Sequence, residues 1–237
     1  RQGVEAKTAA EFNAMEKGSV PYKVTGCVRE ITNTQYGNMY VADHTGSVYV
    51  YGTLDADGNS KNFASLGIEV GDIVSVVSPV DVFKDAAQMK NATVAEKIDV
   101  EAKTVEAFLA TEEDKTYYRL TGTVSGIADG DIYGNMTITD ETGSVYVYGL
   151  LSGYGGEKKL FQDLVADTNL SNGDKLTLVG YHTSHKGNPQ VGGAFYLLHE
   201  EGSEGGEGGE EPAAPESKGK KTVEEFIAAA DKDNYYE

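Results

Sequence analysis

Two long segments of this chain occur twice. Residues 7–28, KTAAEFNAMEKGSVPYKVTGCV, return at residues 103–124 as KTVEAFLATEEDKTYYRLTGTV. Residues 36–52, YGNMYVADHTGSVYVYG, return at residues 133–149 as YGNMTITDETGSVYVYG, with 13 of 17 positions identical. A repeat of about 96 residues is long enough to bury a core of its own. We therefore expect two copies of one small module rather than one large domain.

The repeat predicts four segments. We expect one module at residues 1–100 and a second at residues 101–200, each with a leading helix. Residues 201–220 are rich in Gly and Glu, contain prolines and lack apolar periodicity, which predicts an extended, self-repelling linker. Residues 221–237, KTVEEFIAAADKDNYYE, match the start of the second copy. They are expected to form the leading helix of a truncated third module, or a helix that packs alone as a terminal cap.

Each copy is expected to open with a short helix and to continue into a strand. The threonines Thr8, Thr104 and Thr222 can cap these helices, and the second and third copies add a nearby glutamate. Residues 22–31 alternate as in a half-buried strand, which predicts that Val24 points inward and Cys27 outward.

The remaining apolar runs complete five strands in each copy. Two runs joined by HTGS or ETGS predict a hairpin, and the run after Gly-Asp predicts a fourth strand. The predicted second, third and fifth strands are residues 39–43, 48–51 and 88–94 in the first copy, and residues 136–140, 145–148 and 190–197 in the second. Five short strands with a helix-length connection between the third and fourth favour a closed barrel over a seven-stranded sandwich. The expected fold is mainly β, with two tandem five-stranded barrels.

The motifs V-x-G-x-V, YGN-x-hydrophobic-x-D-x-TGS-V-x-V and GD-x-V-x-V cover residues 20–96 and 116–198. This pattern resembles the OB-fold nucleic-acid-binding modules of the anticodon-binding type. It is most similar to the tandem OB domains of exported, lipid-anchored proteins of Bacteroidetes-type bacteria. The resemblance implies an extracellular or cell-surface location, with a lipid anchor upstream of this chain. It also implies a binding face on the second and third strands and on the loops between strands one and two and strands four and five.

Tyrosines are the candidate ligand contacts on this face. If Val48 and Val50 fill the core, Tyr49 and Tyr51 must point outward. The predicted ligand-binding residues are Tyr36, Tyr40, Tyr49, Tyr51 and Lys84 in the first copy, and Tyr133, Tyr146, Tyr148 and Lys186 in the second. The alternative is that these tyrosines are ordinary strand residues that cover a leading helix or a domain interface.

The charge of the chain weighs against a phosphate-rich ligand. The formal net charge is −18; residues 1–100 hold 9 Lys/Arg against 13 Asp/Glu, and residues 101–200 hold 7 against 14. An acidic surface repels phosphate backbones, and affinity for them normally needs several cations in one groove. The other candidate basic residues are Lys23, Arg29, Lys61, Lys90, Arg119, Lys158 and Lys159.

Catalysis, cofactors and metals are not expected. No nucleophile, phosphate-binding or zinc motif occurs in both copies, so the chain is predicted not to be an enzyme. His182 and His185 have a metal-compatible spacing, and residues 55–59, DADGN, faintly resemble a calcium loop, but neither pattern is complete. Cys27 is the single cysteine and has no disulfide partner in this chain, and no apolar run is long enough for a transmembrane segment.

Three functions remain open at this point. The first is a non-catalytic module that binds an extended polymer, either single-stranded nucleic acid or an oligosaccharide. The second is a structural or protein-interaction repeat that meets neighbouring copies or other surface proteins and buries Tyr49 and Tyr51. The third is a set of accessory domains of a larger secreted nuclease.

Overall fold

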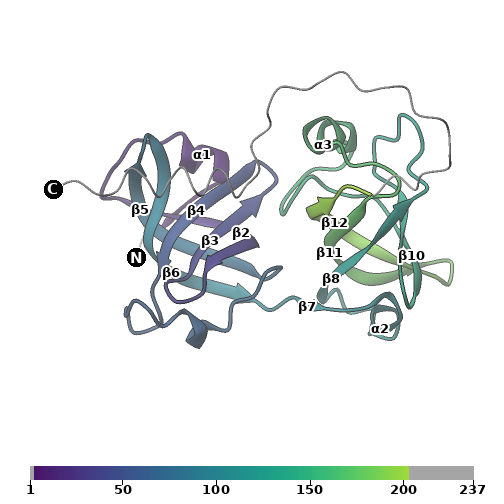
Figure 1. Ribbon diagram of the computed structural model, residues 1–237, viewed down its shortest axis with the longest axis horizontal. Coiled ribbons are helices and arrows are strands. Elements are labelled where there is room, and N and C mark those ends of the chain that lie inside the picture. The colour runs from purple at the N-terminus through teal and green to yellow at the C-terminus, as the bar shows by residue number, and fades with distance from the viewer. Residues whose placement is uncertain (1–2, 203–237) are drawn as a thin grey trace, which may run out of the picture. The chain divides into compact units, whose positions relative to one another are not determined.

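In each half of the chain a sheet closes into a barrel because its first and fourth barrel strands pair with each other (Figure 1). The computed structural model describes residues 3–202. Within them one six-stranded sheet spans residues 5–98 and the other spans residues 101–200. Residues 203–220 of the expected linker and the expected third helix at residues 221–237 lie outside the described residues.

The strands of the first barrel are β2 (Pro21–Asn33), β3 (Asn38–Asp43), β4 (Gly46–Thr53), β5 (Ile73–Phe83) and β6 (Ala86–Ile98). Their order is β2-β3-β4-β6-β5, and β5 pairs back onto β2. All the barrel pairs are antiparallel except β4 with β6, which is parallel. A closed five-stranded barrel with this strand order is of the OB type.

The second barrel repeats this arrangement. Its strands are β8 (Tyr117–Ser125), β9 (Met136–Asp140), β10 (Gly143–Val147), β11 (Lys175–His185) and β12 (Asn188–Glu200). Again the third and fifth strands, β10 and β12, are parallel, and β11 closes the barrel onto β8. The predicted fold class, mainly β with two OB-type barrels, is confirmed.

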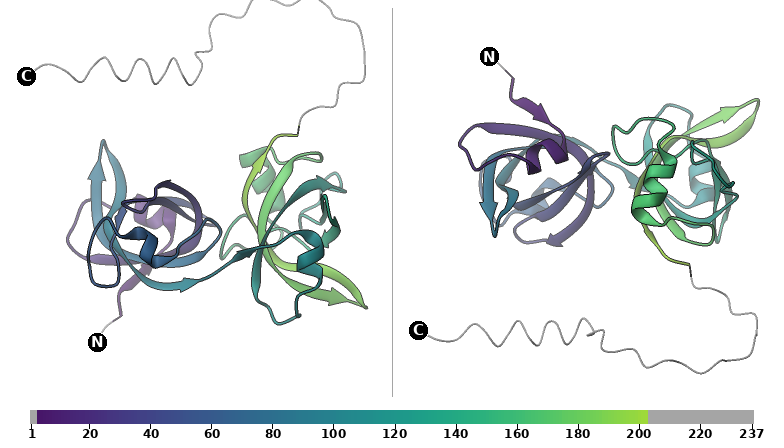
Figure 2. Two further views of the ribbon diagram at one scale, coloured as in Figure 1. Left: turned by 60° about the horizontal axis from the view of Figure 1, so that its bottom comes forward. Right: turned by 90° about the horizontal axis from the view of Figure 1, so that it is seen from above.

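Alternating apolar residues fill each barrel, because successive side chains of a strand point to opposite faces. Val24 and Val28 on β2 and Val48 and Val50 on β4 are fully buried. The two hairpins that join the fourth and fifth strands reach beyond their barrels (Figure 2). No helix among the described residues is both long and apolar enough to cross a membrane.

Short helices α1 (Ala9–Asn13) and α2 (Val105–Leu109) lead into the barrels, and each buries a phenylalanine, Phe12 or Phe108. The predicted N-caps are confirmed, since Thr8 and Thr104 accept hydrogen bonds from the third helical N–H. The glutamate of a complete capping box is in the first copy rather than the second, because Glu11 occupies the third helical position there and Ala107 occupies it in the second. Thr222 lies outside the described residues.

Two very short strands, β1 (Glu5–Lys7) and β7 (Glu101–Ala102), add in parallel to the first strand of each barrel. They were not predicted from the sequence. A segment of two or three residues is too short to show the alternation by which a strand is recognised.

The repeated D-x-T-G motif holds the leading helix in place. The N–H of Ala9 donates to Asp43 Oδ2 (2.8 Å), and the N–H of Ala10 donates to Thr45 Oγ1 (3.0 Å). In the second barrel, Asp140 and Thr142 accept from the N–H groups of Val105 and Glu106 in the same way. These bonds satisfy amides that a helix start leaves free, so the motif serves the fold.

The repeated YGN motif fixes the connection between the third and fourth barrel strands. This connection contains the 3₁₀ helix η1 (Phe63–Leu66) in the first barrel and the helix α3 (Phe161–Thr168) in the second. Gly37 and Gly134 have positive φ angles, and a Cβ at either position would collide with the ring of Phe63 or Phe161. Glycine is therefore required at the centre of the motif.

Cys27 lies on the face of β2 opposite the barrel core, as predicted, but this position is buried rather than half-exposed. It is 1% exposed and belongs to an apolar cluster with residues of both halves of the chain: Ile73, Val100, Val179, Phe195 and Leu197. Its Sγ donates to the carbonyl of Gly71 (3.1 Å), and burial raises the pKa of the thiol to about 12. The predicted exposure was wrong because residues of the second barrel cover this face of β2 at Cys27.

Candidate functional site

Outward-facing tyrosines follow the buried valines on the third barrel strands. Tyr51, next to the buried Val50, is 49% exposed, and Tyr148 at the end of β10 is 62% exposed. Tyr146 is exposed as well. The predicted orientation of these rings is confirmed, and their contact with a ligand stays a prediction.

In the first barrel Tyr40 and Tyr49 form a pair across strands β3 and β4. The two residues lie directly opposite each other, with ring centroids 4.9 Å apart and the rings tilted by 43°. They line a groove of about 470 Å³ together with Phe83, whose ring is 60% exposed. Phe83 was not predicted; its only signal in the sequence is its place beside a tight turn. The second barrel has Thr137 in place of Tyr40.

The tyrosines of the YGN motif carry an ammonium group over the ring in both barrels. Lys61 Nζ lies 5.5 Å from the ring centroid of Tyr36, and Lys159 Nζ lies 5.9 Å from that of Tyr133. Both lysines have positive φ angles and precede the buried phenylalanine of the connection by two residues. An exposed ring with a cation above it is thus repeated at equivalent positions, an arrangement typically worth about 0.5–1 kcal/mol.

Lys84 and Lys186 lie at the exposed tips of the hairpins between the fourth and fifth barrel strands. Each begins a two-residue turn in which both residues have positive φ, with Asp85 or Gly187 second. Such turns match the twist of the flanking strands. Lys84 Nζ lies 5.5 Å from the ring centroid of Phe83, beside the groove that Tyr40 and Tyr49 line. Their contact with a ligand stays a prediction.

A second groove, of about 590 Å³, lies on the outer wall of the second barrel and is called the tyrosine groove here. Three rings line it, those of Tyr133, Tyr148 and Tyr181. The polar residues of its lining are Asn135, Lys158, Thr183 and Gln190, and none of its lining residues is a carboxylate. Tyr181 was not predicted, because its counterpart in the first copy is proline.

The basic residues do not gather into a stripe along either groove. Lys158 is the only cationic side chain that lines the tyrosine groove, and no lysine or arginine lines the groove of Tyr40 and Tyr49. Lys23 and Arg119 are half-buried rather than exposed. These two grooves therefore offer aromatic faces without the row of charges that phosphate backbones normally require.

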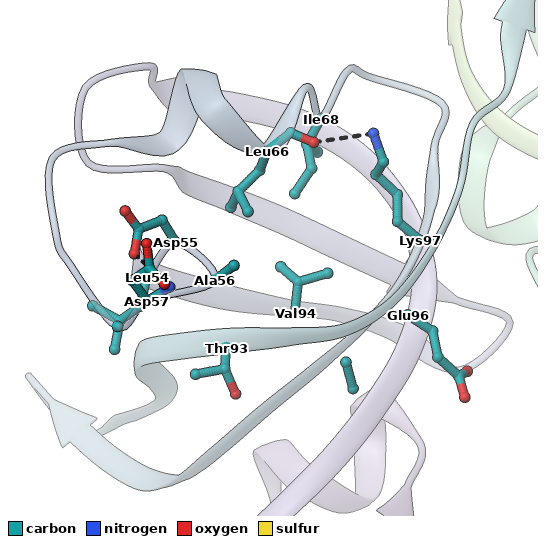
Figure 3. A pocket seen from close by; sticks show the side chains of 12 residues that line it. Leu54, Asp55, Ala56, Asp57, Leu66, Ile68, Thr93, Val94, Glu96 and Lys97 are labelled. Carbon is teal, nitrogen blue, oxygen red and sulfur yellow. Dashed lines mark hydrogen bonds between the residues drawn. The ribbon is translucent and has the colours of Figure 1, made fainter.

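A further hollow of about 470 Å³ lies beside the loop that follows β4 (Figure 3). Asp55, at its edge, accepts hydrogen bonds from the backbone of Asp57 and Asn59 and from the side chains of Asn59 and Asn62. The Asn62 amide and these other donors lower the pKa of Asp55 to about 2. The ammonium group of Lys97 also donates hydrogen bonds, to the carbonyls of Leu66 and Gly67. The DADGN segment is thus a turn held by its own carboxylate, and no aromatic ring lines this hollow.

The two histidines of the H-x-x-H pattern have different surroundings. His182 is buried against Phe108, with ring centroids 5.2 Å apart, and its Nδ1 lies 2.8 Å from the carbonyl oxygen of Thr111. His185 is exposed at the end of β11. In the part of the chain that the structure describes, no group of three or more His, Cys, Asp or Glu residues is placed to hold a metal ion.

No protein-family model matches the sequence, and no curated protein matches it. Among solved structures, similarity is found to the Ifi202 HINa domain in complex with 20bp dsDNA, at 15% identity, 77% coverage of this chain, 99% of that chain and a TM-score of 0.34. Similarity is found also to the p204 HINb domain, at 15% identity, with coverage of 74% of this chain and 92% of that chain and a TM-score of 0.32. For fission yeast Pot1 and ssDNA the identity is 9%, the match covers 82% of this chain and 84% of that chain, and the TM-score is 0.26. Similarity this low carries no conclusion about what the present chain binds.

Proposed function

We propose that this chain is a non-catalytic tandem module that binds an extended polymer on exposed tyrosine rings of its two OB-type barrels. One observation carries the proposal. Equivalent positions of both barrels, Tyr36 with Tyr133 and Tyr51 with Tyr148, present exposed rings, while the neighbouring strand residues fill the core.

Exposed rings at repeated positions suit a polymer with flat repeating units. Stacking of a nucleotide base on such a ring is typically worth about 1–3 kcal/mol and is tolerant of sequence. Two barrels on one chain raise the effective concentration of the second binding event, so modest contacts add up on a long ligand.

Bases and sugars both have faces that stack on tyrosine. They differ in charge, because a nucleic acid carries phosphates and a neutral sugar chain does not. The formal net charge of −18 and the lack of lysines along the first groove favour a ligand that does not depend on phosphate contacts. Nucleic-acid binding should weaken steeply with salt, whereas sugar binding should not.

The protein-interaction alternative requires Tyr49 and Tyr51 to be covered. Among residues 3–202 the ring of Tyr51 is half exposed, so the other barrel of the same chain does not cover it. We also propose that the protein acts at the cell surface or outside the cell, on the strength of the sequence resemblance described above.

Calorimetric titration of the full chain tests the proposal. The probes are a twelve-residue oligothymidylate and neutral hexasaccharides, each at low and high salt. We expect at least one probe to bind, and the double variant Tyr51→Ala with Tyr148→Ala to bind it at least about tenfold more weakly. Val20→Ala, an exposed side chain outside both grooves, is the control and should leave the affinity unchanged. Absence of binding by every probe, or equal affinity of the double variant, would contradict the proposal.

A further inference from the structure

We infer that the tyrosine groove of the second barrel is a subsite for an uncharged oligosaccharide, and that the first barrel carries no equivalent subsite. The inference rests on the proposed function and names the ligand class for one of its surfaces. It is carried by the placement of Tyr181, by the difference between the two copies and by the chemistry of the lining.

Tyr181 lies flat against a strand that has no side chains at the point of contact. A Cβ built on Gly192 would lie 2.8 Å from Cε2 of the Tyr181 ring, and a Cβ on Gly193 would collide with Cε1. Gly193 also has a φ of 56°, which favours glycine. The two glycines therefore make room for the ring on the barrel wall.

The first barrel differs at all three of these positions. Aligned through the Gly-Asp that precedes the fourth barrel strand, Pro79 corresponds to Tyr181, Lys90 to Gly192 and Asn91 to Gly193. Asn91 keeps the positive φ of the backbone, so the strand path is the same in both copies. The changes thus alter the surface of the wall and not the fold, so the first barrel lacks the ring and the glycines that form this part of the groove.

The lining of the groove suits a pyranose chain. Three tyrosine rings offer apolar faces for the C–H surfaces of sugars, and Tyr148 is the most exposed of them. Asn135, Thr183 and Gln190 supply amide and hydroxyl groups that both donate and accept hydrogen bonds, as sugar hydroxyls require. A mainly apolar hollow with a few convergent polar groups is the usual form of a small-molecule site.

Two of the three rings, those of Tyr181 and Tyr133, are already positioned before a ligand arrives. Tyr181 contacts Tyr117 edge to face, with ring centroids 5.9 Å apart, and rests on the diglycine on its other side. Tyr133 is held by the ammonium group of Lys159 over its ring. Binding to rings that are fixed in this way costs less conformational entropy.

Charge argues against a nucleic acid in this groove. Residues 101–200 hold 7 Lys/Arg against 14 Asp/Glu, and Lys158 is the single cation in the lining. One cation releases few counterions from a phosphate backbone, whereas an uncharged sugar chain needs none.

The test uses the full chain and four neutral hexasaccharides, of β-1,4-glucose, β-1,3-glucose, β-1,4-xylose and α-1,6-mannose, with the twelve-residue oligothymidylate beside them. Tyr148→Ala removes the exposed ring, and Gly192→Lys with Gly193→Asn introduces the residues of the first barrel, which its fold accepts. We expect at least one hexasaccharide to bind with an affinity independent of salt, and each variant to weaken it by about tenfold or more. Val20→Ala is the matched control and should leave the affinity for the hexasaccharide unchanged.

The outcomes separate this inference from the proposed function. Hexasaccharide binding that survives both variants would overturn the subsite while leaving polymer binding by the chain intact. Binding of oligothymidylate alone would overturn the sugar assignment and leave the proposed function standing. Failure of all five probes to bind would overturn both.

Discussion

The cores of the two barrels differ at the buried position that is His182 in the second barrel and Val80 in the first. The ring is buried, and among the described residues its Nε2 atom has no hydrogen-bond partner. A buried polar atom left without a partner typically costs about 1–3 kcal/mol. The first copy shows that a valine fits the same place in the fold.

His182→Val is therefore expected to stabilise the second barrel. The substitution removes the unpaired nitrogen and gives up one hydrogen bond to the carbonyl of Thr111, so a net gain of about 1 kcal/mol in the free energy of unfolding is expected. Urea denaturation followed by circular dichroism measures it. His185→Val, at an exposed position, is the control; a destabilised His182→Val protein would contradict this expectation.

At the scale of elements, each leading helix is attached to its barrel through one carboxylate. Asp140 accepts hydrogen bonds from the N–H groups of Val105, Thr142 and Gly143 and from the Thr142 hydroxyl. Partial burial raises the pKa of Asp140, but these bonds outweigh burial and the net shift is downward from 3.8. A depressed carboxyl pKa means that the native state favours the charged form.

Asp140→Ala is expected to lower the free energy of unfolding by about 1–2 kcal/mol, since it removes the acceptor at the helix start. The stabilisation by Asp140 is fully present above its ordinary pKa of 3.8 and is lost as the pH falls through the lower native value. The difference between wild type and variant should therefore be constant near pH 7 and shrink below about pH 4. Urea titrations at pH 7, 4 and 3 measure it. Glu141→Ala is the exposed control, and a difference that grows on acidification would refute this role for Asp140.

Most elements could be predicted from the sequence because their signals are local. Strand alternation located the barrel strands and the outward direction of Tyr51, and the threonine caps located the two leading helices, α1 and α2. The errors concern contacts between distant segments. Cys27 is covered by residues of the second half, and the place of Tyr181 depends on two glycines of a neighbouring strand. No local pattern encodes either contact.

At the scale of the whole molecule, the repeat gives two barrels with the same strand order and different surfaces. The first carries the Tyr40–Tyr49 pair beside an exposed Phe83, and the second carries the tyrosine groove. Two of their shared features, the D-x-T-G cap and the glycine of the YGN motif, serve the fold, whereas the shared tyrosines, Tyr36 with Tyr133 and Tyr51 with Tyr148, are exposed. The aromatic rings that line the two grooves differ between the copies.

The most direct test of the central claim is an NMR spectrum of the full chain with isotope-labelled tyrosine rings, recorded with and without the hexasaccharide or oligothymidylate that binds. The chain has 15 tyrosines, and those of both grooves are among them, so their ring signals report on both barrels. We expect shifts for Tyr148 with Tyr133, for Tyr51 with Tyr36, or for both pairs, and none for the half-buried Tyr22. Binding that leaves the signals of Tyr51 and Tyr148 unchanged would contradict the central claim.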